Sequence, residues 1–163
     1  MELTHVDSEG KARMVDVSEK KETQREARAF GRVTMSDQTY AIVKTGYGPK
    51  GDIFTVAKIA GIMGTKKTHE MIPLCHPLSL TLIDVDYTFD DEQHAIGITS
   101  TVKTRGQTGV EMEAMHCVTL VALTIYDMCK AIDKGIELGP FYLLEKSGGK
   151  SGTFVRKAPN RKA

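Results

Sequence analysis

The feature that most constrains the fold is a strand–turn–strand pattern followed by a long amphipathic helix, between residues 80 and 135. Residues 80–89 and 95–102 are rich in β-branched and aromatic or aliphatic side chains and flank a polar turn over residues 90–93. Apolar residues then recur at alternating steps of three and four, which is helical spacing. They are Met115, Val118, Ala122, Ile125, Cys129 and Ile132. This succession predicts a β-hairpin and then a helix that continues to about residues 134–135, where a glycine follows a lysine.

The elements on either side complete an α+β pattern. Residues 25–35 are predicted to form a strand, and Ser36 suits the N-cap of a helix over residues 37–44. Asp52 suits the cap of a second helix, and residues 136–145 suit a last strand. The apolar positions of the second helix are Ile53, Val56, Ala57, Ala60 and Met63. The order β-α-α-β-β-α-β predicts a ferredoxin-like α+β sandwich, with an antiparallel sheet and helices on one face.

Length and composition narrow the class of protein. A chain of 163 residues fits one domain over 1–163, and we expect the polar ends, 1–12 and 157–163, to be flexible. A net charge of +1 gives no support to a nucleic-acid or membrane partner, and no apolar run approaches the ~18 residues of a membrane span. The N-terminus lacks a signal-peptide pattern, and the three cysteines form no CxxC pair. We therefore expect a cytoplasmic protein with free thiols.

The segment from Lys66 to Leu78 concentrates groups that can carry chemistry. Pro73 and Pro77 each fix their own φ and move the preceding residue out of the helical region, so residues 74–76 form a stiff, extended tripeptide. That tripeptide is Leu74, Cys75 and His76. Stiff loops that carry His and Cys between regular elements are common places for binding and catalysis. A buried Cys–His pair that merely packs the loop remains the alternative.

Two glycine-rich stretches invite comparison with phosphate-binding loops. The loop over residues 46–51 places Lys50 just before a helix N-terminus, where backbone N–H groups and the helix dipole favour an anion. Residues 149–151 have the Gly-Lys-Ser ending of a Walker A loop. However, Leu144 stands where that motif needs glycine, and no helical pattern follows. The sequence therefore disfavours a nucleotide kinase.

Two other functions stay open on the residues alone. Imidazole and thiolate groups are the preferred ligands of zinc. The candidates are His69, Cys75, His76, His116 and Cys117. Their spacings match no structural zinc motif, so a zinc-dependent nucleotide or pterin cyclohydrolase rests on ligand type alone. A non-enzymatic nucleotide-binding module of the same fold is the other alternative, although residues 95–102 lack the aromatic side chains on which RNA-recognition modules stack bases.

The long helix carries acids near both ends. Acids in a first turn ordinarily interact with the helix dipole, and Asp127 with Lys130 is ordinarily a surface i,i+3 pair. Yet Glu113 and Asp127 lie roughly along one face, with Leu120 and Thr124 between them. A carboxylate beside a lysine can supply an acid and a base to one substrate. The residues alone leave both interpretations open.

Taken together, these motifs resemble the cyclic pyranopterin monophosphate synthase family of molybdenum cofactor biosynthesis. The matching segments, in order, are residues 14–18, 48–52, 66–68, 72–78, 109–114, 126–131 and 144–152. The resemblance implies a lyase that receives a cyclised GTP derivative, (8S)-3',8-cyclo-7,8-dihydroguanosine 5'-triphosphate. The enzyme would rearrange this compound into cyclic pyranopterin monophosphate and release pyrophosphate.

The resemblance also implies roles for individual residues. It makes Asp127 and Lys130 catalytic. The implied substrate-binding residues are Leu74, Cys75, His76, Met112, Glu113, Lys50, Glu111 and Lys146. The substrate's chemistry agrees, because a triphosphate needs cations and a guanine-like ring needs a carboxylate to accept its N–H groups. Lys66 and Lys67 are further cations for the triphosphate. No cofactor or resident metal is implied, apart from Mg²⁺ that would accompany the triphosphate.

The resemblance further implies a homohexamer built as a trimer of dimers. Glu113 and Asp127 are fourteen residues apart, which is about 21 Å along a helix. Reacting groups must approach their target atoms within about 3–3.5 Å. The simplest resolution is a site between subunits, with Glu113 from one chain and Asp127 from its neighbour. The alternative is that one of the two acids is merely structural.

Overall fold

The structure is a computed structural model, and it describes residues 5–7, 9–150 and 152–157. In chain order the elements are β1 (Thr23–Thr34), α1 (Asp37–Val43), β2 (Tyr47–Gly48), β3 (Gly51–Asp52), α2 (Ile53–Thr65), α3 (Thr68–Met71), β4 (Leu80–Asp90), β5 (Ala95–Gly106), α4 (Glu111–Cys129), β6 (Glu137–Ser147) and β7 (Phe154–Val155). We predicted that residues 1–12 and 157–163 are flexible. Of these, residues 1–4, 8 and 158–163 lie outside the described residues, and the flexibility stays a prediction.

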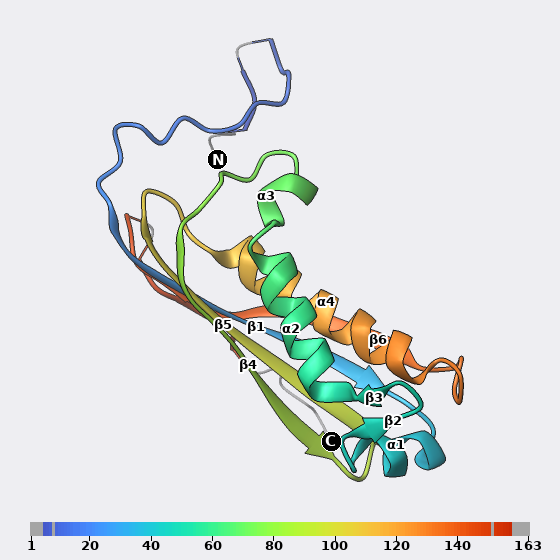
Figure 1. Cartoon of the computed structure of the whole chain (residues 1–163). Coiled ribbons are helices and arrows are strands. Elements are labelled where there is room, and N and C mark those ends of the chain that lie inside the picture. The colour runs from blue at the N-terminus through green and yellow to red at the C-terminus, as the bar shows by residue number, and fades with distance from the viewer. Residues whose placement is uncertain (1–4, 8, 151, 158–163) are drawn as a thin grey trace.

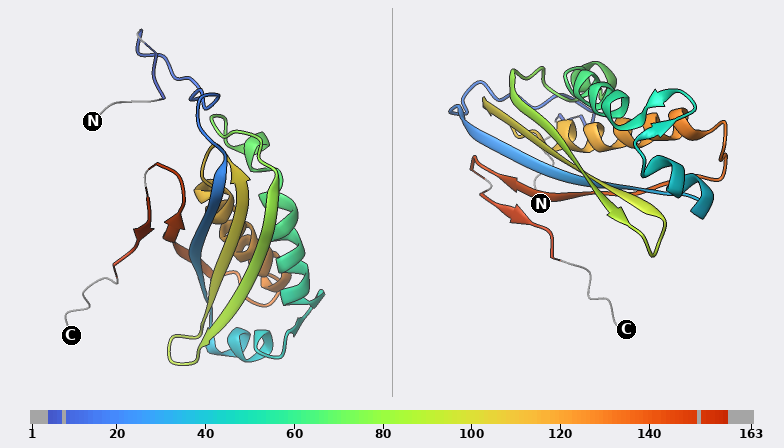
Figure 2. Two further views of the ribbon diagram at one scale, coloured as in Figure 1. Left: turned by 90° about the vertical axis from the view of Figure 1, so that its left-hand side faces the viewer. Right: turned by 60° about the horizontal axis from the view of Figure 1, so that its bottom comes forward.

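The main sheet has five strands in the order β4-β5-β1-β6-β7, and all neighbouring strands are antiparallel. The first strand lies at the centre, where it pairs with β5 from Thr23↔Gly106 to Thr34↔Ala95 and with β6 on its other side. Helices α2 and α4 lie side by side on one face of this sheet (Figure 1, Figure 2). The predicted ferredoxin-like α+β sandwich is confirmed.

The predicted helix starts and hairpin are also confirmed. Ser36 Oγ accepts a hydrogen bond from the Thr39 N–H at 3.4 Å and caps α1. Asp52 caps α2 with both oxygens, since Oδ1 accepts from the Thr55 N–H at 2.9 Å and Oδ2 from the Thr55 hydroxyl at 2.7 Å. Strands β4 and β5 pair from the turn onward, beginning at Asp90↔Ala95.

Two details of the helices differ from the predictions. α4 ends at Cys129 and not near residue 134. Residues 130–132 form a turn instead, in which the Ile132 N–H donates to the Cys129 carbonyl at 2.9 Å. In α2 the predicted apolar positions do not all face the core. Val56 is 42% exposed and Met63 59% exposed. The buried positions of α2 are instead Ile53, Ala57, Gly61 and Thr65, at four-residue spacing.

The core lies between the two long helices and the sheet. Gly61 lets α2 approach α4 closely, since a Cβ there would press on the Val121 side chain. Within the part of the chain that the structure describes, α4 is the helix long and apolar enough to cross a membrane by length and composition. Half of that apolar window is buried, and Val118 and Ile125 are among its fully buried core residues. Packing against the sheet and α2 therefore accounts for the apolar character of α4.

Candidate active site

Asp127 lies near the C-terminal end of α4 between two lysines. Its Oδ2 is 2.6 Å from Lys50 Nζ, and its Oδ1 is 2.7 Å from Lys130 Nζ. Lys50 comes from the turn between β2 and β3, where Gly51 adopts φ +99°, a conformation that favours glycine. The three side chains are each about half exposed, so this cluster faces solvent.

The charges of this cluster reinforce one another. Hydrogen bonds from Lys130 and Lys50 lower the pKa of Asp127 to about 2, and the same pairing raises the pKa of Lys130. At neutral pH the cluster therefore holds one carboxylate and two ammonium groups. Its excess positive charge can attract an anion such as a phosphate group.

A cavity of about 330 Å³ lies at the other end of α4. Its walls include six of the residues predicted to bind substrate, and they are Leu74, Cys75, His76, Glu111, Met112 and Glu113. Val15 and Val17, from the segment before β1, line it as well. His76 Nε2 donates a hydrogen bond to the Val15 carbonyl at 2.7 Å, because a carbonyl can only accept. In the neutral imidazole Nδ1 is then the acceptor.

Glu113 is the most buried charged side chain of this cavity. It is 4% exposed, and burial raises its pKa to about 7, with a further contribution from the neighbouring Glu111 carboxylate. The pKa of the Cys75 thiol is raised by burial and by Glu113, so Cys75 stays a neutral thiol here. A carboxyl with a pKa near neutrality can accept an N–H group or exchange a proton at physiological pH.

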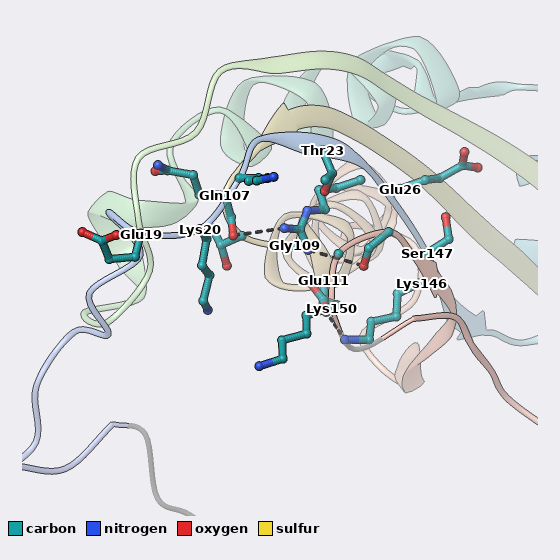
Figure 3. A pocket seen from close by; sticks show the side chains of 15 residues that line it. Glu19, Lys20, Thr23, Glu26, Gln107, Gly109, Glu111, Lys146, Ser147 and Lys150 are labelled. Carbon is teal, nitrogen blue, oxygen red and sulfur yellow. Dashed lines mark hydrogen bonds and ion pairs between the residues drawn. The ribbon is translucent and has the colours of Figure 1, made fainter.

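A larger cavity, of about 680 Å³, adjoins the first. The two cavities have Lys20, Thr108, Gly109 and Glu111 in common. Figure 3 shows the larger one, where Lys146 reaches across to Glu111 with its Nζ 3.0 Å from Oε1. Its basic lining residues are Lys20, Lys21, Arg25, Lys146 and Lys150. Sequence reasoning selected Lys146 and Glu111 but missed Lys20, Lys21 and Arg25, because basic residues within a segment of mixed charge give no distinctive signal.

The structure thus divides the predicted site residues between the two ends of α4. One group is Lys50, Asp127 and Lys130, and the other is Leu74, Cys75, His76, Glu111, Met112, Glu113 and Lys146. α4 has 19 residues and so is about 28 Å long. Lys66 and Lys67 line neither cavity. One chain therefore does not gather these residues around a single reacting centre.

The imidazole and thiol groups do not form a cluster either. Across residues 5–7, 9–150 and 152–157, no group of three or more His, Cys, Asp or Glu side chains could hold a metal ion. Cys117 is fully buried in the core, and His116 Nδ1 lies 3.0 Å from the Thr68 hydroxyl. The alternative zinc site is not assembled in the described part of one chain.

Comparison with known proteins gives a consistent result. The model of the MoaC family matches residues 14–149. A protein of Pelotomaculum thermopropionicum is 55% identical over 155 residues, which is 95% of this chain and 91% of that protein. A protein of Thermoanaerobacter pseudethanolicus is 53% identical over 96% of this chain and 99% of its own length, and one of Heliobacterium modesticaldum is 54% identical over 95% and 98%. All three are named cyclic pyranopterin monophosphate synthase. With a family match over most of its length and relatives above half identity, this chain belongs to the MoaC family.

Proposed function

We propose that this chain is a cyclic pyranopterin monophosphate synthase, the activity for which its relatives are named. Its substrate is the small cyclised guanosine triphosphate, and its products are the cyclic pyranopterin phosphate and pyrophosphate. The observation that carries the proposal beyond the names is a buried Glu113 carboxyl in a cavity that adjoins a larger one, in whose lining five basic residues outnumber Glu19, Glu26 and Glu111. A carboxyl can accept the N–H groups of a guanine-like ring, and a basic cavity suits phosphates.

The roles of the site residues follow from the two groups. In the proposed site Glu113 accepts the N–H groups of the ring, with residues 74–76, Glu111 and Met112 around it. Lys50, Lys130 and Lys146 bind phosphate oxygens, and Asp127 and Lys130 transfer protons. When phosphate oxygens take over hydrogen bonds from Lys130 and Lys50, the pKa of Asp127 rises from about 2 toward its ordinary range. Substrate binding thus makes Asp127 a better base.

The outer face of the helix layer is apolar, and this supports a site shared between two subunits. Val56, Ile59 and Met63 of α2 and Leu123 of α4 are between 42% and 59% exposed. Two copies related by a two-fold axis present the same patch to each other. If two antiparallel α4 helices cross near Leu120, which is midway between Glu113 and Asp127, each Glu113 lies opposite the partner chain's Asp127 position. We therefore propose a dimer with sites between its subunits, and three such dimers in a homohexamer, as the family resemblance implies.

Two further properties complete the proposal. The protein works in the cytoplasm, which agrees with three cysteines that are all free thiols, two of them buried. It needs no resident metal or organic cofactor, and any Mg²⁺ enters with the triphosphate. Neither a nucleic acid nor a membrane is a partner.

A direct assay tests the function, and subunit complementation tests the shared site. Purified protein should convert the cyclised triphosphate with stoichiometric release of pyrophosphate, and a wild-type protein that releases none would refute the function.

For the shared site, the Glu113→Ala and Asp127→Ala proteins are unfolded and refolded together. Random pairing makes half of the dimers mixed, and each mixed dimer has one complete site, so about a quarter of wild-type activity should return. The control is the double variant refolded alone, which should stay inactive. Mixed oligomers as inactive as their parents would rule out the shared site.

A further inference from the structure

A pair of glycines just after β6 has an unusual conformation. Gly148 adopts φ +96° and Gly149 φ +75°, both in the left-handed region. A Cβ at Gly148 would overlap the Gln24 carbonyl oxygen, and a Cβ at Gly149 would overlap Arg25 Nη1. These glycines therefore allow the chain to wrap closely around the Arg25 side chain. This is a structural reason for a glycine segment that does not form a Walker A loop.

Arg25 lies on the central strand β1 and joins two segments that leave the sheet. Its Nη2 donates to the Gln107 carbonyl at 3.1 Å and its Nε to the Gly106 carbonyl at 3.3 Å. Its Nη1 donates to the Gly148 carbonyl at 3.4 Å. Gly106 is the last residue of β5, and Gly148 follows the last residue of β6. The guanidinium thus hydrogen-bonds to backbone carbonyls near the points where the pairing of β1 with β5 and with β6 ends.

The chemistry of arginine suits this role. A guanidinium is planar and carries donors in fixed directions on three nitrogens, whereas a lysine has one nitrogen. The partners of Arg25 within the described residues are carbonyl groups of two separate segments, and no described carboxylate pairs with it. Its bonds therefore fix the distance between those segments.

The two segments that Arg25 joins carry the wall between the cavities. After Gln107 come Thr108, Gly109 and Glu111, which line both cavities. Two residues before Gly148 is Lys146, whose ion pair with Glu111 connects the same two segments at 3.0 Å (Figure 3). A change in their separation would move Glu111 relative to Lys146, and with it the mouth of the cavity that holds Glu113.

We propose that Arg25 is a positioning residue of the active site, which holds this shared wall and the Glu111–Lys146 pair in place. Gly148 and Gly149 have no side chains, so the backbone there can pass close to the Arg25 guanidinium. The effect on catalysis rests on the proposed function, whereas the effect on the segments does not. Three of its five N–H donors are bound to backbone carbonyls and fix the guanidinium in place, so we assign Arg25 a role through the residues it holds.

The test compares Arg25→Gln and Arg25→Lys with a matched control, Arg28→Gln. Arg28 lies on the same strand, pairs with the half-buried Glu145 at 3.9 Å and lines neither cavity. Hydrogen exchange of the intact protein should show at least about tenfold faster exchange over residues 107–110 and 148–150 in Arg25→Gln, with the centre of β1 unchanged. Because small displacements cost up to about 100-fold in rate, kcat/KM should fall about 10- to 100-fold. Arg28→Gln should match the wild type in both measurements, and Arg25→Lys should recover at most part of the loss.

A double-variant cycle with Lys146→Gln separates positioning from a general structural role. If Arg25 acts through the Glu111–Lys146 pair, Arg25→Gln should lower kcat/KM less than about threefold once Lys146 is already changed. If the double variant loses kcat/KM by the full product of the two single effects, the positioning role is overturned. Hydrogen exchange at the wild-type rate over both segments in Arg25→Gln would overturn it too. If Arg25→Gln fails to fold, Gly149→Ala displaces the guanidinium from the other side and is measured in the same way. Hydrogen exchange needs no substrate. An inactive wild type would therefore refute the proposed function, while exchange still decides whether Arg25 holds the two segments together.

Discussion

Replacing Glu113 with glutamine should remove a pH-dependent loss of stability. Glu113 is 4% exposed, and its pKa rises from 4.5 to about 7 on burial. At 1.36 kcal/mol per pKa unit, this change disfavours the ionised folded form by about 3 kcal/mol. Between those two pKa values the folded chain holds the proton more tightly than the unfolded chain. The stability from this group is therefore complete below pH 4.5 and is lost as the pH rises through 7.

The assay is urea unfolding of wild type and Glu113→Gln at pH 5 and pH 8, at one chain concentration because oligomers add to apparent stability. From pH 5 to pH 8 the linkage relation gives the wild type a loss of about 2.5 kcal/mol that the glutamine variant lacks. Burial lowers the pKa of His116, so the contribution of His116 to stability grows as the pH rises, opposite to that of Glu113. Both proteins contain His116, and its contribution therefore cancels when their pH dependences are subtracted. Equal pH dependence of the two proteins would refute the reasoning.

Three other changes test separate parts of the account. Lys130→Ala should lower turnover at least about 100-fold with the fold intact by circular dichroism, since acid–base groups contribute about 10²–10⁴ in rate; near-normal turnover at saturating substrate would contradict its catalytic role. Asp52→Ala removes both hydrogen bonds to Thr55 and should shift the unfolding equilibrium by about 2- to 30-fold, as loss of a helix cap does, and an unchanged urea midpoint would argue against the cap. Elemental analysis should find no stoichiometric zinc; activity lost on chelation and restored by zinc alone would instead favour the cyclohydrolase.

Local signals in the sequence were sufficient to predict most of the fold. Ser36 and Asp52 cap their helices as the pattern indicates, and the 90–93 turn joins a hairpin, because both features depend on residues close together in the chain. β7 was not predicted. It has two residues, and its pairing of Phe154 with Lys146 is not visible as a period in so short a segment.

Apolar periodicity failed in α2 for a physical reason. The face toward α4 and the sheet contains small or polar residues such as Gly61 and Thr65, because the helices approach closely there. The larger Val56, Ile59 and Met63 face outward. A period-based prediction assigns every apolar stripe to the core of its own chain. It cannot distinguish a core face from one that a second copy would cover, which is the role we propose for these residues.

The separation of Glu113 and Asp127 along one helix follows from the sequence, whereas the end of α4 at which Lys50, residues 74–76 and Lys146 lie depends on packing. The same division separates the electrostatics of the two acids. Burial brings the pKa of Glu113 to about 7, whereas two lysines hold that of Asp127 at about 2. Carboxyls whose surroundings move their pKa values apart commonly serve different roles in one mechanism. In the unliganded chain Glu113 is thus the acid closer to proton exchange at neutral pH, and Asp127 is held as a carboxylate. In the proposed mechanism Asp127 becomes a better base when phosphate oxygens take over hydrogen bonds from Lys50 and Lys130, so binding of the triphosphate favours proton transfer to Asp127.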